Sequence, residues 1–454
     1  MMGEIDLFLS HIKNWVWGPP LLILLIGSGV YLSILLRGVQ IRYLGYALKQ
    51  AFSSQQNASA GDISQFQALM TSLAGAIGTG TIVGVSTAVT VGGLGAIFWM
   101  WVMAFLGMAI KYAESLLAVK FRVMDAKGEM CGGPMQYIEY GLGWKWMAIV
   151  FAVFGAIAAI GTGNLVQVNA IAEAIGNVWV VDPWISGVCI SIVVAMIIIG
   201  GVKSIGSVSS IVVPVMALFY LAAGMIIIAI HIEKVPEALW MIVSSAFNGH
   251  AAAGGFAGAS VMMAIQMGVA RSVFSNEAGL GISSMAAGAA KTDCPGRQAM
   301  ITMTGALLST VVVCSVTGLV LAVTGVFGKV GASGKILTGA TLAIQAFNST
   351  LWGGDYIVSI GLILFAFTTV IAWAYYGEKC FEYLFGVRSV IIYRILYTLI
   401  IIPGAALKIE IVWHLADISN GLMAIPNLIA LIALSTVIVA ETKSFLKIVK
   451  KEQA

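Results

Sequence analysis

The sequence predicts an all-α protein that crosses a membrane many times, and three observations support this fold class. Hydrophobic residues make up 60% of the 454 and charged residues only 10%, whereas a soluble domain carries about 25% charged residues. Mean hydropathy is +0.99. Many apolar runs reach the roughly 20 residues that a helix needs to cross the hydrocarbon core, and they lack the short alternating pattern of a membrane β-barrel.

Eleven apolar runs are predicted to be membrane spans. They cover residues 15–36, 65–90, 93–119, 146–176, 183–201, 208–231, 255–289, 298–327, 352–376, 388–406 and 424–442. Glu4 and Asp6 precede the first run, which is the wrong charge for a secretory signal, so we expect that span to be retained. Two amphipathic stretches, 336–350 and 409–421, are expected to lie at an interface or packed across the protein, although the second could belong to a span.

Lysine and arginine in the short loops predict the orientation of the protein in the cell membrane. If the lysine-rich C-terminus lies in the cytoplasm, an odd number of spans puts the N-terminus outside. Eighteen basic residues, Lys111 among them, then lie on the cytoplasmic side. Five lie outside, namely Lys13, Lys234, Lys329, Lys335 and Lys408, and Arg271 lies within a span. The basic residues therefore indicate membrane topology, and we expect no nucleic-acid partner.

Glycines interrupt the second predicted span at AGAIGTGTIVG, residues 74–84. Each glycine costs a helix interior up to about 1 kcal/mol relative to alanine, so their density needs a reason. Pairs such as Gly80 with Gly84, or Gly254 with Gly258, fit the pattern of closely packed helices, and either pair alone is more often packing than function. A second such stretch, FSNEAGLGISSMAAG, lies in the span 255–289. We predict helix breaks at four glycines: Gly78, Gly80, Gly279 and Gly281.

The two interruptions lie about two hundred residues apart, with four predicted spans between them. Matching interruptions in two five-span halves indicate a transporter built from inverted repeats. The predicted divisions are an N-terminal span with an amphipathic cytoplasmic segment (1–64), a first repeat (65–231), a second repeat (255–442) and a cytoplasmic tail (443–454). A broken helix exposes N–H groups that suit a carboxylate and carbonyl groups that suit a small cation. A zwitterionic amino acid travelling with Na+ fits such a site.

Three motifs resemble those of the alanine or glycine:cation symporter family. They are AIGTGTIVG with the following GGLGAIFWMW (92–101), GGPMQYIEYGLG (132–143) and FSNEAGLG (274–281). The resemblance implies a LeuT-type fold of five plus five inverted spans after one extra N-terminal span. It also implies sodium-coupled uptake of alanine or glycine by alternating access, in the cell membrane of a prokaryote. We expect a functional monomer without an organic cofactor.

The resemblance also assigns roles to residues near the breaks. The backbone N–H groups of Thr79 and Gly80 would bind the substrate carboxylate. Sodium would bind carbonyl or hydroxyl oxygens of five residues: Ala74, Ile77, Phe365, Thr368 and Thr369. A threonine pair in a span more often bonds its own helix backbone, and the nearby break is what favours a cation site. Relatives with a second sodium carry asparagine where Thr81 stands, which leaves a second ion open.

Other polar and aromatic residues at membrane depth are candidates for the site. We expect four of them to line the substrate pocket: Asn164, Gln167, Phe274 and Asn276. Asn164 and Gln167 share a helix face and either line the pocket or bridge helices, and Phe274 is expected to be an aromatic lid. Arg271 and Glu277 are costly within a span and are functional candidates for that reason. Glu277 either balances the substrate amine or caps a half-helix, and Glu114 is expected to be structural.

Other classes of protein fit less well. An intramembrane metalloprotease needs HExxH, but the four histidines are dispersed, and no GxxxxGK[ST] loop indicates ATP use. Five scattered cysteines without CxxC spacing argue against a disulfide framework or a zinc site. We therefore expect no enzyme, no catalytic residue and no metal other than Na+. A channel normally forms its pore from several short subunits or a filter loop. A carrier of the same fold for another small amino acid, or one coupled to protons, is the open alternative.

Overall fold

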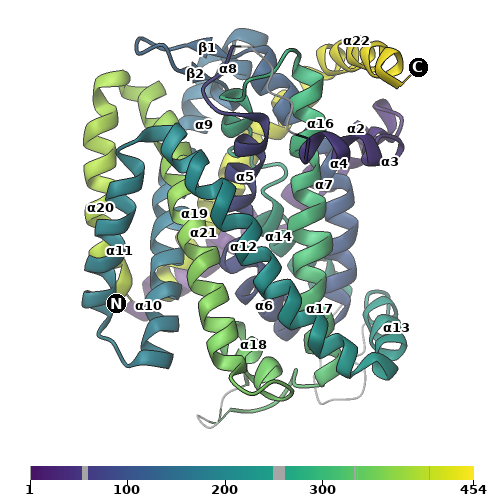
Figure 1. Cartoon of the computed structure of the whole chain (residues 1–454), viewed down its shortest axis with the longest axis vertical. Coiled ribbons are helices and arrows are strands. Elements are labelled where there is room, and N and C mark those ends of the chain that lie inside the picture. Colours follow the sequence, from purple (N-terminus) through teal and green to yellow (C-terminus); the bar gives the residue numbers. More distant parts are fainter. Residues whose placement is uncertain are drawn as a thin grey trace.

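The computed structural model describes residues 2–53, 60–248, 261–331, 334, 336–407 and 409–453. Most of these residues are helical, and the longer helices run side by side along the long axis of the molecule (Figure 1). Eight helices in the described residues are long and apolar enough to cross a membrane. The all-α membrane fold class predicted from the sequence is therefore confirmed.

The elements follow one another in four groups. The N-terminal part comprises α1 (Met2–Val16), α2 (Pro19–Leu35), α3 (Val39–Arg42) and α4 (Leu44–Ala51). The first broken helix and its neighbours are α5 (Gln65–Ala76), η1 (Thr79–Thr81), α6 (Val83–Gly92), α7 (Gly95–Lys120), β1 (Val123–Met124), β2 (Met130–Cys131), α8 (Pro134–Gln136), η2 (Tyr137–Gly141), α9 (Lys145–Ala158), η3 (Ala159–Leu165), α10 (Val166–Trp179), α11 (Pro183–Ile198) and α12 (Gly201–Ile230).

The third group contains the second broken helix, α14 with α15. This group comprises η4 (Ile232–Lys234), α13 (Val235–Ser245), α14 (Val261–Asn276), α15 (Ser284–Gly288), α16 (Pro295–Ala306), η5 (Leu307–Cys314), α17 (Ser315–Thr324), α18 (Gly339–Asn348) and α19 (Gly354–Phe385). The C-terminal group is η6 (Val387–Ser389), α20 (Val390–Ala406), α21 (Ile409–Ala433) and α22 (Ser435–Gln453). The strands β1 and β2 form one short antiparallel hairpin.

The predicted end of the chain is wrong in one respect. The last candidate span lies in α21, Ile409–Ala433, which includes the stretch 409–421 that we expected at an interface or packed across the protein, with a place in a span left open. The predicted span 424–442 does not exist as one helix, because the chain turns at Leu434 and continues as α22. The polar face of 409–421 misled the prediction because its Asp417 pairs inside the protein with Arg271. The other amphipathic stretch, 336–350, contains the short helix α18, as expected.

The span count of eleven stays a prediction. Besides the eight long helices, the described residues hold the shorter apolar helix α11 and two interrupted pairs, α5 with α6 and α14 with α15. α7, α19 and α21 are the most buried of the candidate spans, since 83%, 72% and 72% of their apolar windows are buried, against 39% for α12 and for the span that contains α20. The interrupted helices pack against α7 and α19. The two interrupted helices therefore lie at the centre of the bundle.

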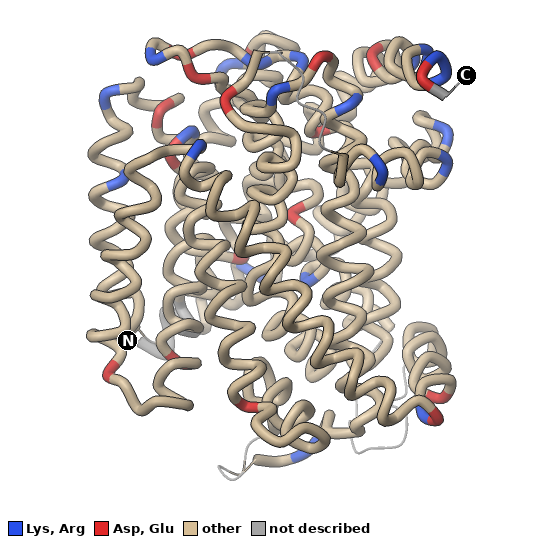
Figure 2. The backbone as a smooth tube through the Cα atoms, viewed as in Figure 1, with Lys and Arg blue, Asp and Glu red and all other residues tan. Residues whose placement is uncertain are grey.

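Lysine and arginine gather at one end of the bundle, around the β1–β2 hairpin, α4 and α22 (Figure 2). The opposite end, near α13 and α18, carries few of them. This asymmetry has the form expected from the loop charges, and the placement of that end in the cytoplasm stays a prediction. One residue was assigned wrongly: Lys111 lies within α7, where it is 1% exposed, and not in a loop.

Two glycines bring the loop after β2 against α15. A Cβ on Gly288 would lie 2.7 Å from the Cα of Gly132, closer than real Cβ contacts come. Gly27 in α2, in contrast, has no atom within 4 Å of the position that a Cβ would take. The hairpin is thereby fixed to the second broken helix.

We expect Gly288→Ala to lower the melting temperature of the purified protein by several degrees, because overpacking a close contact costs about 1–3 kcal/mol. Gly27→Ala should leave it unchanged or raise it slightly, since alanine is the better helix former. A fluorescence-monitored thermal melt of both variants in the same detergent measures this. Equal melting temperatures for the two variants would contradict the proposed role of the contact.

Candidate functional site

The first glycine-rich stretch forms the predicted helix break. Residues 77–82 leave the α-helical path inside the bundle and include the single turn η1. A Cβ on Gly78 would collide with the Thr369 hydroxyl, and one on Gly80 would lie 2.6 Å from the Phe274 ring. The two glycines thus let the broken backbone approach α19 and α14 directly.

The second break is stabilised by the Glu114 side chain of α7. α14 ends at Asn276, and the chain then passes through positive φ at Glu277 (59°), Gly279 (91°) and Gly281 (75°) before α15 begins. Glu114 Oε1 accepts the backbone N–H groups of Gly279 and Gly281 at 2.9 and 3.0 Å. The structural role expected for Glu114 is confirmed, and it is the role of a partner for backbone groups that no helix satisfies.

Hydroxyl and carbonyl oxygens converge where α5 meets α19. Thr369 Oγ1 lies 2.9 Å from the Ala74 carbonyl oxygen of α5 and 3.0 Å from the Phe365 carbonyl oxygen. Thr368 Oγ1 lies 3.0 Å from the same Phe365 oxygen. Four of the five residues predicted to hold a cation are therefore together. Ile77 follows α5 directly, and the contact of its carbonyl group with a cation stays a prediction.

Gln167 of α10 occupies the N–H side of the first break. Its Oε1 accepts the Thr79 N–H at 3.2 Å, and its amide donates to the Thr162 carbonyl at 3.0 Å. A substrate carboxylate that binds this N–H would replace a neutral amide oxygen. The Thr79 hydroxyl is buried without a hydrogen-bond partner among the described residues. Asn164 bridges helices by donating to the Tyr397 carbonyl at 2.7 Å, so its contact with substrate stays a prediction.

Asn276 is bound within the second break itself. Its Nδ2 donates to the hydroxyls of Ser272 and Thr310 at 3.0 and 3.2 Å, and its Oδ1 accepts the Ala278 N–H at 2.9 Å. Both ends of the amide are therefore used by the protein. The predicted contact of Asn276 with substrate is not tested by these bonds, which show that its amide oxygen accepts a backbone N–H of the second break.

A cavity of about 520 Å³, lined in part by α18, reaches Arg271 and Trp413 near the first break. Phe274 stacks on Trp413 with ring centroids 5.4 Å apart. The Arg271 guanidinium lies 5.7 and 5.5 Å from these two ring centroids and pairs with Asp417 at 3.3 Å. Phe274 thus lies between Gly80 and Trp413, and its role as a lid stays a prediction.

Three residues around the breaks were not predicted from the sequence. Trp413 and Asp417 belong to the stretch 409–421, whose polar residues we took for an interfacial face. Lys111 was counted in a loop, although a lysine and an acidic residue three positions apart in a long apolar helix share one face, which marks a buried charge cluster. That spacing, Lys111 and Glu114, is the signal that could have found it.

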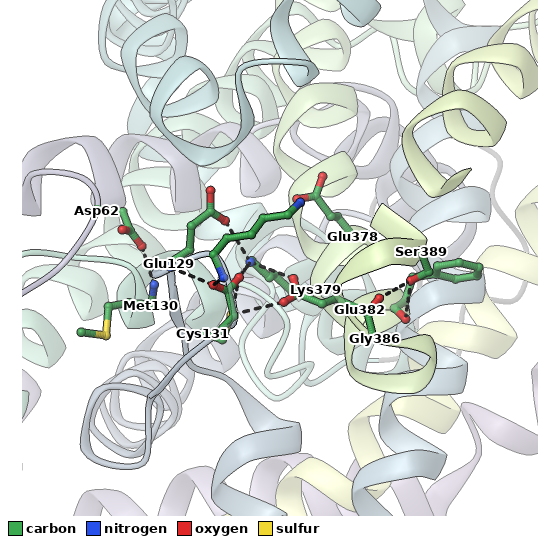
Figure 3. Close-up of polar contacts among 12 residues, drawn as sticks. Asp62, Glu129, Met130, Cys131, Glu378, Lys379, Glu382, Gly386 and Ser389 are labelled. Carbon is green, nitrogen blue, oxygen red and sulfur yellow. Dashed lines mark hydrogen bonds and ion pairs between the residues drawn. The ribbon is translucent and has the colours of Figure 1, made fainter. Parts of the chain in front are cut away.

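An ion cluster closes the other end of the bundle, beside the β1–β2 hairpin (Figure 3). Lys379 Nζ of α19 lies 2.9, 3.2 and 3.6 Å from carboxylate oxygens of Glu382, Glu129 and Asp125. Asp125, Cys131 and Glu382 bring three potential metal ligands within 4.8 Å of one another. The ammonium already supplies the positive charge there, and burial raises the pKa of the Cys131 thiol to about 12, so the thiol stays protonated. The cluster therefore ties the hairpin to α19.

Comparison with known proteins agrees with this geometry. The sequence model of the Sodium:alanine symporter family matches residues 2–454. The chain belongs to this family. It is 52% identical to the sodium/alanine symporter AgcS of Methanococcus maripaludis, over 98% of both chains. It is 36% identical to the probable sodium/glutamine symporter GlnT of Bacillus subtilis, over 96% of this chain and 91% of that one.

The fold is that of LeuT-type transporters. The solved structure of MhsT in complex with L-phenylalanine aligns with a TM-score of 0.59 over 85% of this chain and 99% of that chain, at 13% identity. A likeness at that identity concerns the fold alone. The LeuT-type fold expected from the sequence is confirmed, while the division into five plus five inverted spans stays a prediction.

If the Thr369 hydroxyl binds sodium, Thr369→Ala should raise the sodium concentration for half-maximal transport at least severalfold, because an oxygen ligand is lost. Thr369→Ser should change it little, since the hydroxyl survives. Sodium titrations of uptake by the purified variants in proteoliposomes measure both. An equal rise of the half-maximal sodium concentration in both variants would indicate that the packing at Thr369, and not its hydroxyl group, is what matters.

Proposed function

We propose that the protein carries alanine or glycine into the cell together with Na+, by alternating access. The observation that supports this most directly is the meeting of the Thr369 hydroxyl with the Ala74 and Phe365 carbonyl groups at the first break. Neutral oxygens around a broken helix suit a small hard cation. The name of the 52% identical relative, a sodium/alanine symporter, favours the same substrate and ion.

The substrate would bind above the cation, at the N–H side of the break. Its carboxylate would take the Thr79 and Gly80 N–H groups, where the start of α6 also favours negative charge. Gln167 would give up its bond to Thr79 in exchange. Phe274 lies directly over Gly80 and limits the space for a substrate side chain. This arrangement favours the smallest amino acids.

Alternating access is supported by the contrast between the two ends of the bundle. The α18 end holds the cavity of about 520 Å³, which is lined by Trp413, the stacking partner of Phe274. The hairpin end is held by the Lys379 cluster. Given the loop charges, we place the α18 end outside the cell and the lysine-rich end, with the C-terminus, in the cytoplasm. Substrate would then enter from the cavity and leave past the hairpin.

The proposed coupling ion is tested by uptake into proteoliposomes under imposed gradients. Because the candidate cation site has no carboxylate ligand to carry a proton, alanine uptake should require a sodium gradient and should survive collapse of the pH gradient by a protonophore. Uptake driven equally well by a pH gradient in sodium-free buffer would support the alternative of proton coupling.

The proposed substrate class is tested by a series of side chains of increasing size. Carboxylate capture by backbone N–H groups needs no side chain, so glycine should already bind, and one methylene should change affinity by only about 1–3 kcal/mol. Alanine and glycine should therefore both stabilise the protein in a thermal-shift titration, serine marginally, and glutamine, leucine or phenylalanine should not. Tighter binding of glutamine or leucine than of alanine would mean the right fold with another substrate.

A further inference from the structure

Glu277 is a buried carboxylate whose oxygens are not used by the protein. Its side chain is 1% exposed, and neither Oε1 nor Oε2 has a hydrogen-bond partner among the described residues. Trp373 and Ser283 approach the carboxylate without reaching hydrogen-bond geometry. A charge in such surroundings is costly unless another charge compensates it. An ionised Glu277 therefore needs a compensating positive charge nearby.

The carboxylate faces the part of α5 that also supplies the candidate cation site. A Cβ on Gly75 would lie 3.0 and 3.3 Å from the two Glu277 oxygens, so Glu277 reaches the backbone of α5 at this residue. Ala74, the adjacent residue, is the one whose carbonyl oxygen bonds the Thr369 hydroxyl. By covalent geometry, the Glu277 oxygens are then no more than about 7 Å from that carbonyl oxygen. Glu277 does not ligate the site, but it is close enough to act on it.

The fixed charges around Glu277 do not balance. α7 contributes Lys111 and Glu114, and Lys111 is near enough to attract both carboxylates. The Lys111 ammonium donates to the Asn276 carbonyl at 2.7 Å and to the Ser72 hydroxyl at 3.3 Å, which are neutral groups. From α19, the neutral phenol of Tyr376 faces Gly75 and Glu277. When both carboxyl groups are ionised, they share one ammonium, and one formal negative charge is left over.

We propose that Glu277 is the counter-charge of the transported sodium ion, acting through space on a site built from neutral oxygens. This inference rests on the proposed function and names the residue that sets its sodium affinity. The bound ion neutralises the excess negative charge of the Lys111–Glu114–Glu277 cluster, so ion binding and cluster stabilise each other. Because the same Glu277 belongs to the second break, sodium binding at the first break also stabilises the contact between the two broken helices.

The test compares Glu277→Gln, which removes the charge and keeps the shape, with Glu277→Asp, which keeps the charge and shortens the side chain. A unit charge about 7 Å away in a partly polar interior changes ion affinity by roughly tenfold or more. The half-saturating sodium concentration, from sodium-dependent thermal stabilisation of the purified protein and from alanine uptake, should therefore rise about tenfold in Glu277→Gln. It should stay within about threefold of wild type in Glu277→Asp.

Lys111→Gln is the matched variant. It removes a positive charge where Glu277→Gln removes a negative one, and glutamine retains a hydrogen-bond donor. Removing the positive charge should lower the half-saturating sodium concentration, whereas a purely structural role predicts that both neutral variants weaken sodium binding. The half-saturating sodium concentration of Lys111→Gln still tests the proposal if Glu277→Gln does not fold.

An unchanged sodium half-saturation in Glu277→Gln, or equal effects of Gln and Asp, would overturn the inference. So would weaker sodium binding in Lys111→Gln. Thr369→Ala separates this failure from failure of the proposed function. If Thr369→Ala raises the half-saturating sodium concentration while Glu277→Gln does not, sodium coupling stands and the counter-charge is excluded. If wild-type uptake needs no sodium, the proposed function itself is wrong.

Discussion

Every backbone N–H and carbonyl group inside a membrane needs a partner within the protein, and the two broken helices are where this requirement is hardest to meet. Side chains from neighbouring helices meet it here. Gln167 accepts the N–H of Thr79, the Thr369 hydroxyl bonds the carbonyl of Ala74, and Glu114 accepts two N–H groups of the second break. The shape of the site therefore depends on α7, α10 and α19 as much as on the breaks.

The partners at the two breaks differ in charge, and this difference divides their roles. Gln167 and Thr369 are neutral, so a ligand can replace them without leaving a bare charge behind. Glu114 is a buried carboxylate that also accepts the Asn427 amide at 2.7 Å. Removing a partner from a buried charge is expensive. We therefore expect a ligand to displace the side-chain partners of the first break and to leave those of the second break in place.

The sequence predicts those features that depend on local pattern. The breaks follow from glycine density, and the grouping of Thr369 with Ala74 follows from a family resemblance that the geometry bears out. The sequence does not reveal which face of a helix points toward the protein interior. Lys111 was counted with the loop charges although it lies inside the predicted span 93–119, because a lysine in the sequence does not by itself show whether it is buried. The stretch 409–421 was expected at an interface or packed across the protein, with a place in a span left open, because a polar face suits water and a polar site equally well. Only the packing of α7 and α21 against the breaks decides those cases.

The length and continuity of α19 have a mechanical consequence. This helix runs unbroken over 32 residues and carries Thr369 at the first break and Lys379 in the ion cluster ten positions later. Ten residues of α-helix span about 15 Å, so a tilt of about 5° at Thr369 displaces Lys379 by more than 1 Å. A shift of that size is enough to break the ion pair between Lys379 of α19 and Glu129 of the hairpin turn, whose separation is 3.2 Å. If an ion binds at Thr369 as proposed, a small tilt of α19 couples its binding and release to the ion pairs at the lysine-rich end of the bundle.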